Sequence, residues 1–318
     1  MQVERLCLSP RPYIIEKFEH QLSHAEDAPP LAFYLPQRQL CVLSVADGMG
    51  SAGRYHVKSS EQPDGQLFTM AYVASRQARR SVIKLIRERY ENPELKTPEL
   101  AQQLGRQLHG DFQTLFSKYV FKNGDSCKKN KPWPMGAEPF PTTLSTLIIE
   151  KEQEGGSLIH VLWGGDSPIT ILTPDKFYTT LAGKSSENKY GIFANRKPSL
   201  RYATIHISKD VPFMACATTD GLTTFDSFNF SLELYPPDLY CQLMKEILME
   251  TENMSPQDAI NKVVTAWADF RDTKRQVYLM PDDTTTAVAF SDLAQLRNVS
   301  SQNQWAWFSI DHEQEIFI

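Results

Sequence analysis

Several protein classes are excluded by what this sequence lacks. No uninterrupted apolar run reaches the roughly 18 residues that a helix needs to cross a bilayer, and residues 1–20 contain no apolar stretch long enough for a signal-peptide core. The five cysteines are scattered, without a C-x-x-C pair or a Cys/His cluster of zinc spacing. We therefore expect a soluble, cytoplasmic protein with free thiols, in which Cys41 and Cys216 lie in apolar runs as small hydrophobic residues.

The chain also lacks a strong excess of charge of one sign. With 33 Lys and Arg against 38 Asp and Glu, its formal net charge is −5, which argues against nucleic acid or an anionic membrane as the main partner. A basic loop at 122–136 is interpreted as solvated, because Trp133 alone supplies aromatic character there. Hydrophobic residues make up 41% and charged residues 22%, values typical of a globular protein. Oligomeric state is not readable from this composition.

Hydrophobic periodicity predicts strands first, then two helices, then many strands, two further helices and final strands. Residues 31–46 read as two strands joined by a turn at 36–38, and an exposed loop is predicted for 50–65. Helical spacing follows from Phe68 to Ile86, and a second helix is predicted to begin with Thr97 as N-cap and Pro98 as its first residue. Further strands are predicted at 141–150, 157–163, 168–172, 176–182, 201–207 and 213–219.

The remaining pattern repeats this arrangement. Helical spacing returns at 239–248, a last core helix begins at Ser255 and Pro256, and residues 284–290 form a strand. Trp305 and Trp307 alternate with small or apolar residues, which favours an extra strand over an exposed docking patch. Strict alternation of strand and helix is absent. The pattern therefore favours an α+β fold of mainly antiparallel sheets covered by pairs of helices.

Acidic residues stand where apolar strands meet turns. Such positions are Asp47, Asp166, Asp220 and Asp282, and the pair Glu26–Asp27 precedes the first strands. Each one alone also fits ordinary turn chemistry. Together, carboxylates at the ends of neighbouring strands would repel one another unless cations lay between them. Oxygen ligands of this kind suit hard cations such as Mg²⁺ or Mn²⁺, and Gly48 would let its backbone carbonyl approach as a further ligand.

The order of these motifs resembles a known family. The blocks E-D (26–27), D-G-M-G (47–50), T-T (142–143), G-D-S (165–167), T-D-G (219–221) and D-D-T-T (282–285) are similar to those of the bacterial PPM, or type-2C, metal-dependent serine/threonine phosphatases. The resemblance implies two mainly antiparallel sheets packed as a sandwich between helix pairs. It also implies a single domain over 1–318, with a core at about 20–292, a flap-like insertion at 183–200 and a C-terminal extension at 293–318.

The resemblance further implies a binuclear centre of two Mn²⁺ or Mg²⁺ ions. Asp47 would bridge both ions and Asp220 and Asp282 would complete one of them. Glu26 and the carbonyl of Gly48 would help to hold the other. Two cations of this kind lower the pKa of a water and direct it at phosphorus, and their charge stabilises the transition state.

Two further acidic residues have weaker implied roles. Asp166 matches the position that contributes to a weaker third ion, and Asp27 would orient its neighbours. The sequence departs from the family pattern where an Arg usually grips the substrate phosphate. The stretch before Glu26 contains His20 and His24 instead; either could substitute by donating hydrogen bonds, and we assign phosphate binding to His24.

The leading hypothesis is therefore a phosphatase acting on phosphoserine or phosphothreonine in a protein substrate. One alternative is a non-catalytic or weakly active module that keeps the fold, which the missing Arg favours. Another is a hydrolase of small phosphoesters with the same metal chemistry. The complete acidic set favours an enzyme.

Overall fold

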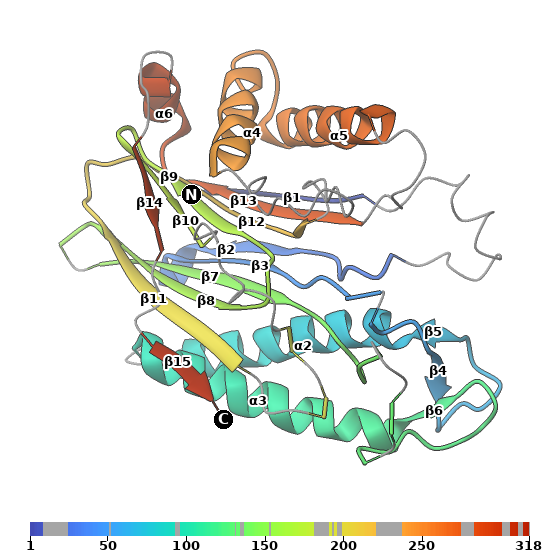
Figure 1. Cartoon of the computed structure of the whole chain (residues 1–318). Helices are drawn as coiled ribbons and strands as arrows, with labels where there is room; N and C mark the ends of the chain where they lie inside the picture. Colours follow the sequence, from blue (N-terminus) through green and yellow to red (C-terminus); the bar gives the residue numbers. More distant parts are fainter. Residues whose placement is uncertain are drawn as a thin grey trace.

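The protein forms two six-stranded sheets packed face to face, each covered on its outer side by a pair of helices (Figure 1). The computed structural model describes residues 1–8, 25–50, 52–92, 96–130, 132–133, 137–152, 154–180, 191–192, 194–195, 199–220, 237–274, 283–300, 306–310 and 314–317. The predicted α+β class and the four-layer sandwich of mainly antiparallel sheets are confirmed.

The first sheet has the order β1-β13-β12-β9-β10-β14. Its pairs are antiparallel except β10 with β14, which run parallel. The sequence pattern does not predict β1, which pairs along its whole length with β13. The strands are β1 (Gln2–Leu8), β9 (Ile169–Leu172), β10 (Lys176–Thr179), β12 (Met214–Thr218), β13 (Thr284–Phe290) and β14 (Ala306–Ser309).

The second sheet is antiparallel throughout, in the order β15-β11-β8-β7-β3-β2. Successive side chains of a strand face opposite sides of the sheet. In β3, accordingly, Leu43 and Val45 pack between the two sheets, whereas Val42 packs toward the helices. The strands are β2 (Leu31–Leu35), β3 (Leu40–Val45), β7 (Leu144–Lys151), β8 (Ser157–Gly164), β11 (Ser199–Ile207) and β15 (Gln314–Phe317), and the short helix η1 (Pro36–Arg38) joins β2 to β3.

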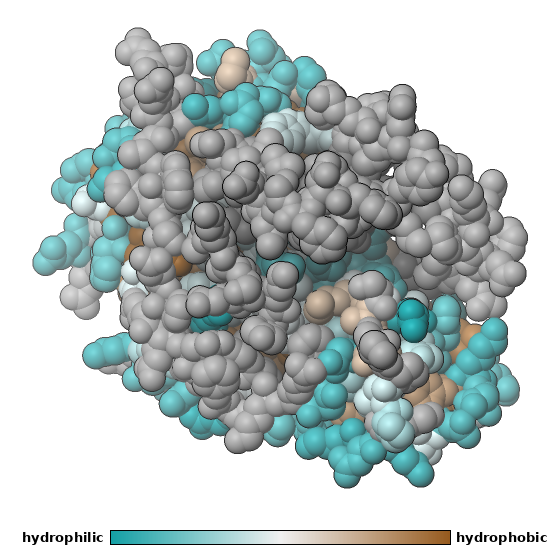
Figure 2. All heavy atoms as spheres, in the orientation of Figure 1, coloured by the Kyte–Doolittle hydropathy of each residue, from teal (hydrophilic) through white to brown (hydrophobic). Residues whose placement is uncertain are grey.

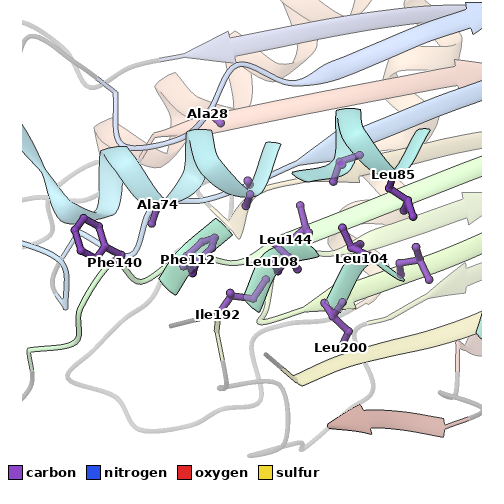
Figure 3. Packing of buried hydrophobic residues seen from close by; sticks show 14 of the residues in the cluster. Ala28, Ala74, Leu85, Leu104, Leu108, Phe112, Phe140, Leu144, Ile192 and Leu200 are labelled. Carbon is purple, nitrogen blue, oxygen red and sulfur yellow. The ribbon is translucent and has the colours of Figure 1, made fainter. Parts of the chain in front are cut away.

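Two helix pairs close the outer faces of the sandwich. In Figure 1, α2 (Met70–Glu91) and α3 (Thr97–Lys118) cover the second sheet, and α4 (Pro237–Glu250) and α5 (Pro256–Lys274) cover the first. Figure 3 shows Leu104, Leu108 and Phe112 of α3 packed toward Leu144 of β7 and Leu200 of β11. A further helix, α6 (Leu293–Ser300), follows β13. The described residues therefore form three apolar cores, one between the sheets and one under each helix pair.

The predicted exposed loop at 50–65 is wrong in part. It contains β4 (His56–Ser59), which pairs with β5 (Phe68–Thr69) and β6 (Tyr119–Phe121) in a small third sheet. Val57, the one large aliphatic residue of β4, is fully buried, and this burial stabilises the strand.

The predicted N-cap of the second helix is also wrong by one residue. Lys96 occupies the cap without a side-chain hydrogen bond, and Thr97 is already helical. The hydroxyl of Thr97 lies 2.7 Å from Nδ1 of His160 and 2.7 Å from the hydroxyl of Thr204 instead. Tertiary polar partners therefore replace the local capping bond. At α5 the prediction is confirmed, because Ser255 accepts a hydrogen bond from the amide of Asp258.

Few large hydrophobic side chains are exposed among the residues described. On the face shown in Figure 2, the coloured residues are mostly hydrophilic and the apolar ones lie in small separate patches. The large hydrophobic residues found exposed are Ile83, Tyr90 and Met249. None of the helices in the described part of the chain is both long and apolar enough to cross a membrane. Most of the predicted flap at 183–200, and Trp305, lie outside the described residues; Trp307 belongs to β14.

Candidate metal centre

Strand register brings the acidic turn residues to one end of the sandwich. In the second sheet Val45 pairs with Ser145, and Leu144 pairs with Gly164, so the turn after β3 lies beside the chain before β7 and the chain after β8. In the first sheet Thr218 pairs with Thr286, which places the end of β12 beside the start of β13. The chain that leaves β8 enters the first sheet at this end, because the amide of Thr218 donates to the carbonyl of Pro168 at 3.1 Å, next to the pairing of β12 with β9.

Asp47 is buried and its backbone is fixed on both sides. Asp47 is only 7% exposed and lies two residues after the end of β3. Its carbonyl accepts hydrogen bonds from the hydroxyl of Thr142 at 2.6 Å and the amide of Thr143 at 2.8 Å. Its amide in turn donates to the hydroxyl of Thr143 at 3.3 Å. The threonine pair noticed in the sequence therefore locks the turn that carries Asp47.

The two glycines after Asp47 allow the segment of Glu26 to approach closely. A Cβ on Gly48 would lie 2.5 Å from the carbonyl oxygen of Glu26 and 2.8 Å from that of Ala71. A Cβ on Gly50 would lie 1.7 Å from Oε2 of Glu26. At Gly48 a side chain would occupy the space of the backbone of this segment, whereas at Gly50 it would displace only the end of the Glu26 side chain. The structure thus places the Glu26 carboxylate against the turn that follows Asp47.

Asp283 ties the same segment to the opposite sheet, a role that the sequence analysis missed. Its Oδ2 accepts a hydrogen bond from the amide of Glu26 at 2.5 Å and lies 3.4 Å from the amide of Asp27. The residues Asp27 and Asp283 are 1% and 5% exposed. Asp283 was visible in the sequence only as the second acidic residue of the D-D-T-T block. Its function as an acceptor for a distant backbone leaves no local signal.

The other predicted ligands are placed less completely. Asp220 follows β12, where the amide of Thr219 donates to the carbonyl of Thr285 at 2.9 Å, so it lies at the same end of the first sheet. Asp166 follows β8, and the neighbouring hydroxyl of Ser167 lies 2.5 Å from that of Thr143. Asp282 and His24 lie outside the described residues. Within the described ranges, no group of three or more His, Cys, Asp or Glu side chains is close enough to hold a metal ion.

The donors that do meet here are suited to a hard divalent cation. Asp47 and Glu26 carry carboxylate oxygens, Gly48 has a backbone carbonyl, and the missing side chains of Gly48 and Gly50 leave room for the backbone and carboxylate of Glu26 beside this turn. Mg²⁺ and Mn²⁺ prefer oxygen ligands of this kind. Buried carboxylates are also costly in a protein interior unless positive charge or hydrogen bonds compensate them. The residues present therefore fit the cations that the resemblance implies.

The buried cysteines do not provide a nucleophile. Cys216 in β12 and Cys41 in β3 are 1% and 0% exposed. Burial raises the pKa of each thiol to about 12, so the reactive thiolate is not available near neutral pH. Cys216 is a core residue, as the sequence predicts.

Comparison with known proteins finds similarity to solved structures but none to family models or curated sequences. No protein-family model matches the chain, and no curated protein matches it. A bacterial serine phosphatase structure has a TM-score of 0.49 at 12% identity, over 92% of this chain and 99% of that chain. The PP2C phosphatase domain of SpoIIE from Bacillus subtilis gives 0.49 at 12%, over 91% and 63%. The PPM Ser-Thr phosphatase MsPP from Mycobacterium smegmatis gives 0.43 at 12%, over 91% and 97%.

Proposed function

We propose that this protein is a phosphatase that depends on Mn²⁺ or Mg²⁺ and hydrolyses phosphoserine or phosphothreonine in protein substrates. The observation that carries the proposal is the meeting of Asp47, Gly48 and Glu26, which are brought together from separate parts of the chain at one end of the sandwich. An ordinary Asp-Gly turn requires no distant carboxylate beside it. Convergence of this kind is expected of a site built for cations.

Each residue of the site would have a defined task. Asp47, Glu26 and the Gly48 carbonyl would hold the cations, with Asp220 and Asp282 as further ligands and Asp166 at a weaker third site. When bound, the cations would activate a water and neutralise charge on the phosphoryl oxygens. The threonine pair at 142–143 holds the Asp47 backbone so that its carboxylate needs little reorganisation on binding.

A second candidate is a phosphatase-like binding module with little turnover. The sequence before Glu26 favours it, because His20 and His24 stand where the family has a phosphate-gripping Arg. A histidine donates fewer hydrogen bonds than the planar fork of an arginine, which would weaken the grip on a phosphoester.

Hydrolysis measured with and without metal tests the proposal. We expect Mn²⁺-dependent release of phosphate from a phosphothreonine peptide, abolished by EDTA and restored by added Mn²⁺. Asp47→Asn should reduce the rate by more than about a hundredfold, since changes to mere outer-shell partners of a metal cost 10–100-fold. Asp210→Asn is the matched control, because Asp210 is exposed before β12, at the opposite end of that strand from Asp220.

The outcomes separate the candidates. Faster turnover of a generic aryl phosphate than of the peptide would favour a hydrolase of small phosphoesters. Mn²⁺ binding without turnover of either substrate would favour the binding module. Equal rates for Asp47→Asn and the Asp210→Asn control would refute the site.

A further inference from the structure

The guanidinium of Arg76 in α2 binds the backbone of the segment that carries Glu26. Its Nη1 donates to the carbonyl of Glu26 at 3.0 Å, and its Nη2 donates to the carbonyl of Ala25 at 2.8 Å. One planar group therefore spans two successive carbonyls. Arginine can do this because its donors form a rigid fork, whereas the ammonium of lysine is a single point of charge.

The guanidinium is itself held in place by stacked aromatic rings. It lies 3.5 Å from the ring centroid of Tyr72, one turn earlier in α2. The Tyr72 ring stacks on Phe68 of β5 with centroids 4.6 Å apart and planes 10° apart. These three residues follow one another at intervals of four. The cation–π contact and the stack leave Arg76 little freedom to leave the carbonyls.

Ser75 adds a second bond from the same helix. Its hydroxyl lies 2.5 Å from the carbonyl oxygen of Glu26, and the residue is fully buried. Nη1 of Arg76 also lies 3.1 Å from this hydroxyl, so the two donors converge on one acceptor. Since the amide of Glu26 donates to Asp283, the peptide groups on both sides of the Glu26 Cα are fixed.

We propose that Arg76 is a positioning residue of the metal centre, which sets the place of the Glu26 carboxylate beside Gly50. The inference rests on the proposed function, because it assigns the purpose of the clamp to cation binding. The clamp fixes the backbone of Glu26, and in this position Gly48 leaves room for its carbonyl and Gly50 leaves room for its carboxylate. Loss of the clamp would let the segment move away from the turn after Asp47.

The geometry separates this role from direct binding of substrate. Two nitrogens of the guanidinium donate to protein carbonyls, and one of its faces lies on the Tyr72 ring. A positioning residue of this kind affects cation affinity. At saturating metal, it leaves the KM for a phosphoester nearly unchanged.

Arg76→Ala, Arg76→Lys and the control Arg80→Ala test the proposal in the full-length protein. Arg80 lies one turn further along α2 and is exposed. Calorimetric titration with Mn²⁺ should show about tenfold weaker binding for Arg76→Ala, partial recovery for Arg76→Lys, and a change within about twofold for the control. With Mn²⁺ saturating, the KM for an aryl phosphate should stay within about twofold of wild type in all three variants.

Hydrogen exchange of the metal-free protein provides a readout that does not depend on metal or activity. The amides of Glu26 and Asp27 should exchange about tenfold faster in Arg76→Ala than in the control, while amides of β7 keep their wild-type rates. Unchanged exchange, or equal Mn²⁺ affinity in Arg76→Ala and the control, would overturn the proposal. An increase in KM at saturating Mn²⁺ would also overturn it, in favour of substrate binding. If the wild type bound no Mn²⁺, the proposed function and the positioning role would fall together, and faster exchange would then identify a purely structural clamp.

Discussion

Replacing Gly50 by alanine should damage cation binding while leaving the fold nearly intact. The new Cβ would lie 1.7 Å from Oε2 of Glu26, whereas ordinary contacts begin at 3.4 Å, so this oxygen has to retreat by about 1.7 Å. Metal–ligand distances tolerate deviations of only about 0.2 Å. The obstacle is the far end of a flexible side chain, and we expect the free energy of unfolding to change by less than about 1 kcal/mol.

Gly48→Ala is the informative counterpart of Gly50→Ala. Its Cβ would meet backbone carbonyls, those of Glu26 at 2.5 Å and Ala71 at 2.8 Å, which cannot rotate away. This substitution should therefore cost about 1–3 kcal/mol in urea unfolding. For Gly50→Ala, calorimetry should show Mn²⁺ affinity about 10- to 100-fold lower than in the wild type.

A double-mutant cycle shows whether the effect of Gly50→Ala passes through Glu26. If the alanine acts by displacing this carboxylate, Gly50→Ala should have no further effect on Mn²⁺ affinity in the Glu26→Ala background. Wild-type affinity in Gly50→Ala, or an equal loss in both backgrounds, would refute the placement of Glu26 at the metal centre.

Three further predictions concern the rest of the molecule. Burial alone raises the pKa of the Glu150 carboxyl, but the neighbouring His160 and Arg89 lower it below its ordinary value of 4.5. The ionised carboxyl therefore contributes fully to stability above pH 4.5, and this contribution is lost as pH falls through the lowered pKa. In urea unfolding, the free energy of unfolding should fall less over this pH range in Glu150→Gln than in the wild type. This variant should also cost about 1–3 kcal/mol at pH 7, because Arg89 loses its partner. Thiol labelling at pH 8 should leave Cys41 and Cys216 unmodified until the protein is unfolded; rapid labelling of the native protein would contradict their burial. Leu108→Ala, at a fully buried position beneath the second sheet, should destabilise the protein by about 2–5 kcal/mol in the same unfolding assay.

The strands and core helices were predictable because their signals are local. The continuous apolar run of β3 and the capping serine before α5 each act within a few residues of the chain. The N-cap of α3 failed for the opposite reason. Thr97 has partners in β8 and β11, more than 60 residues away along the chain, and these override its capping preference.

The residues of the candidate site also differ in whether the sequence predicts them. Asp47 and Gly48 were predicted from a motif, and the structure places them beside Glu26. Asp283 and Arg76 were missed because they act on backbone groups of a distant segment. Any polar side chain at these positions would look like a surface residue in the sequence. The roles assigned to these residues all stay predictions, as do those of Asp282 and His24, which lie outside the described residues.

Anomalous diffraction at the manganese edge, from crystals grown in excess Mn²⁺, examines the central claim most directly. We predict density for manganese in contact with the Asp47 carboxylate and the Gly48 carbonyl, with Glu26 and Asp220 among the neighbouring ligands. Manganese bound only at other places on the protein, or none at the end of the sandwich that carries Asp47, would contradict the assignment of a metal-dependent phosphatase.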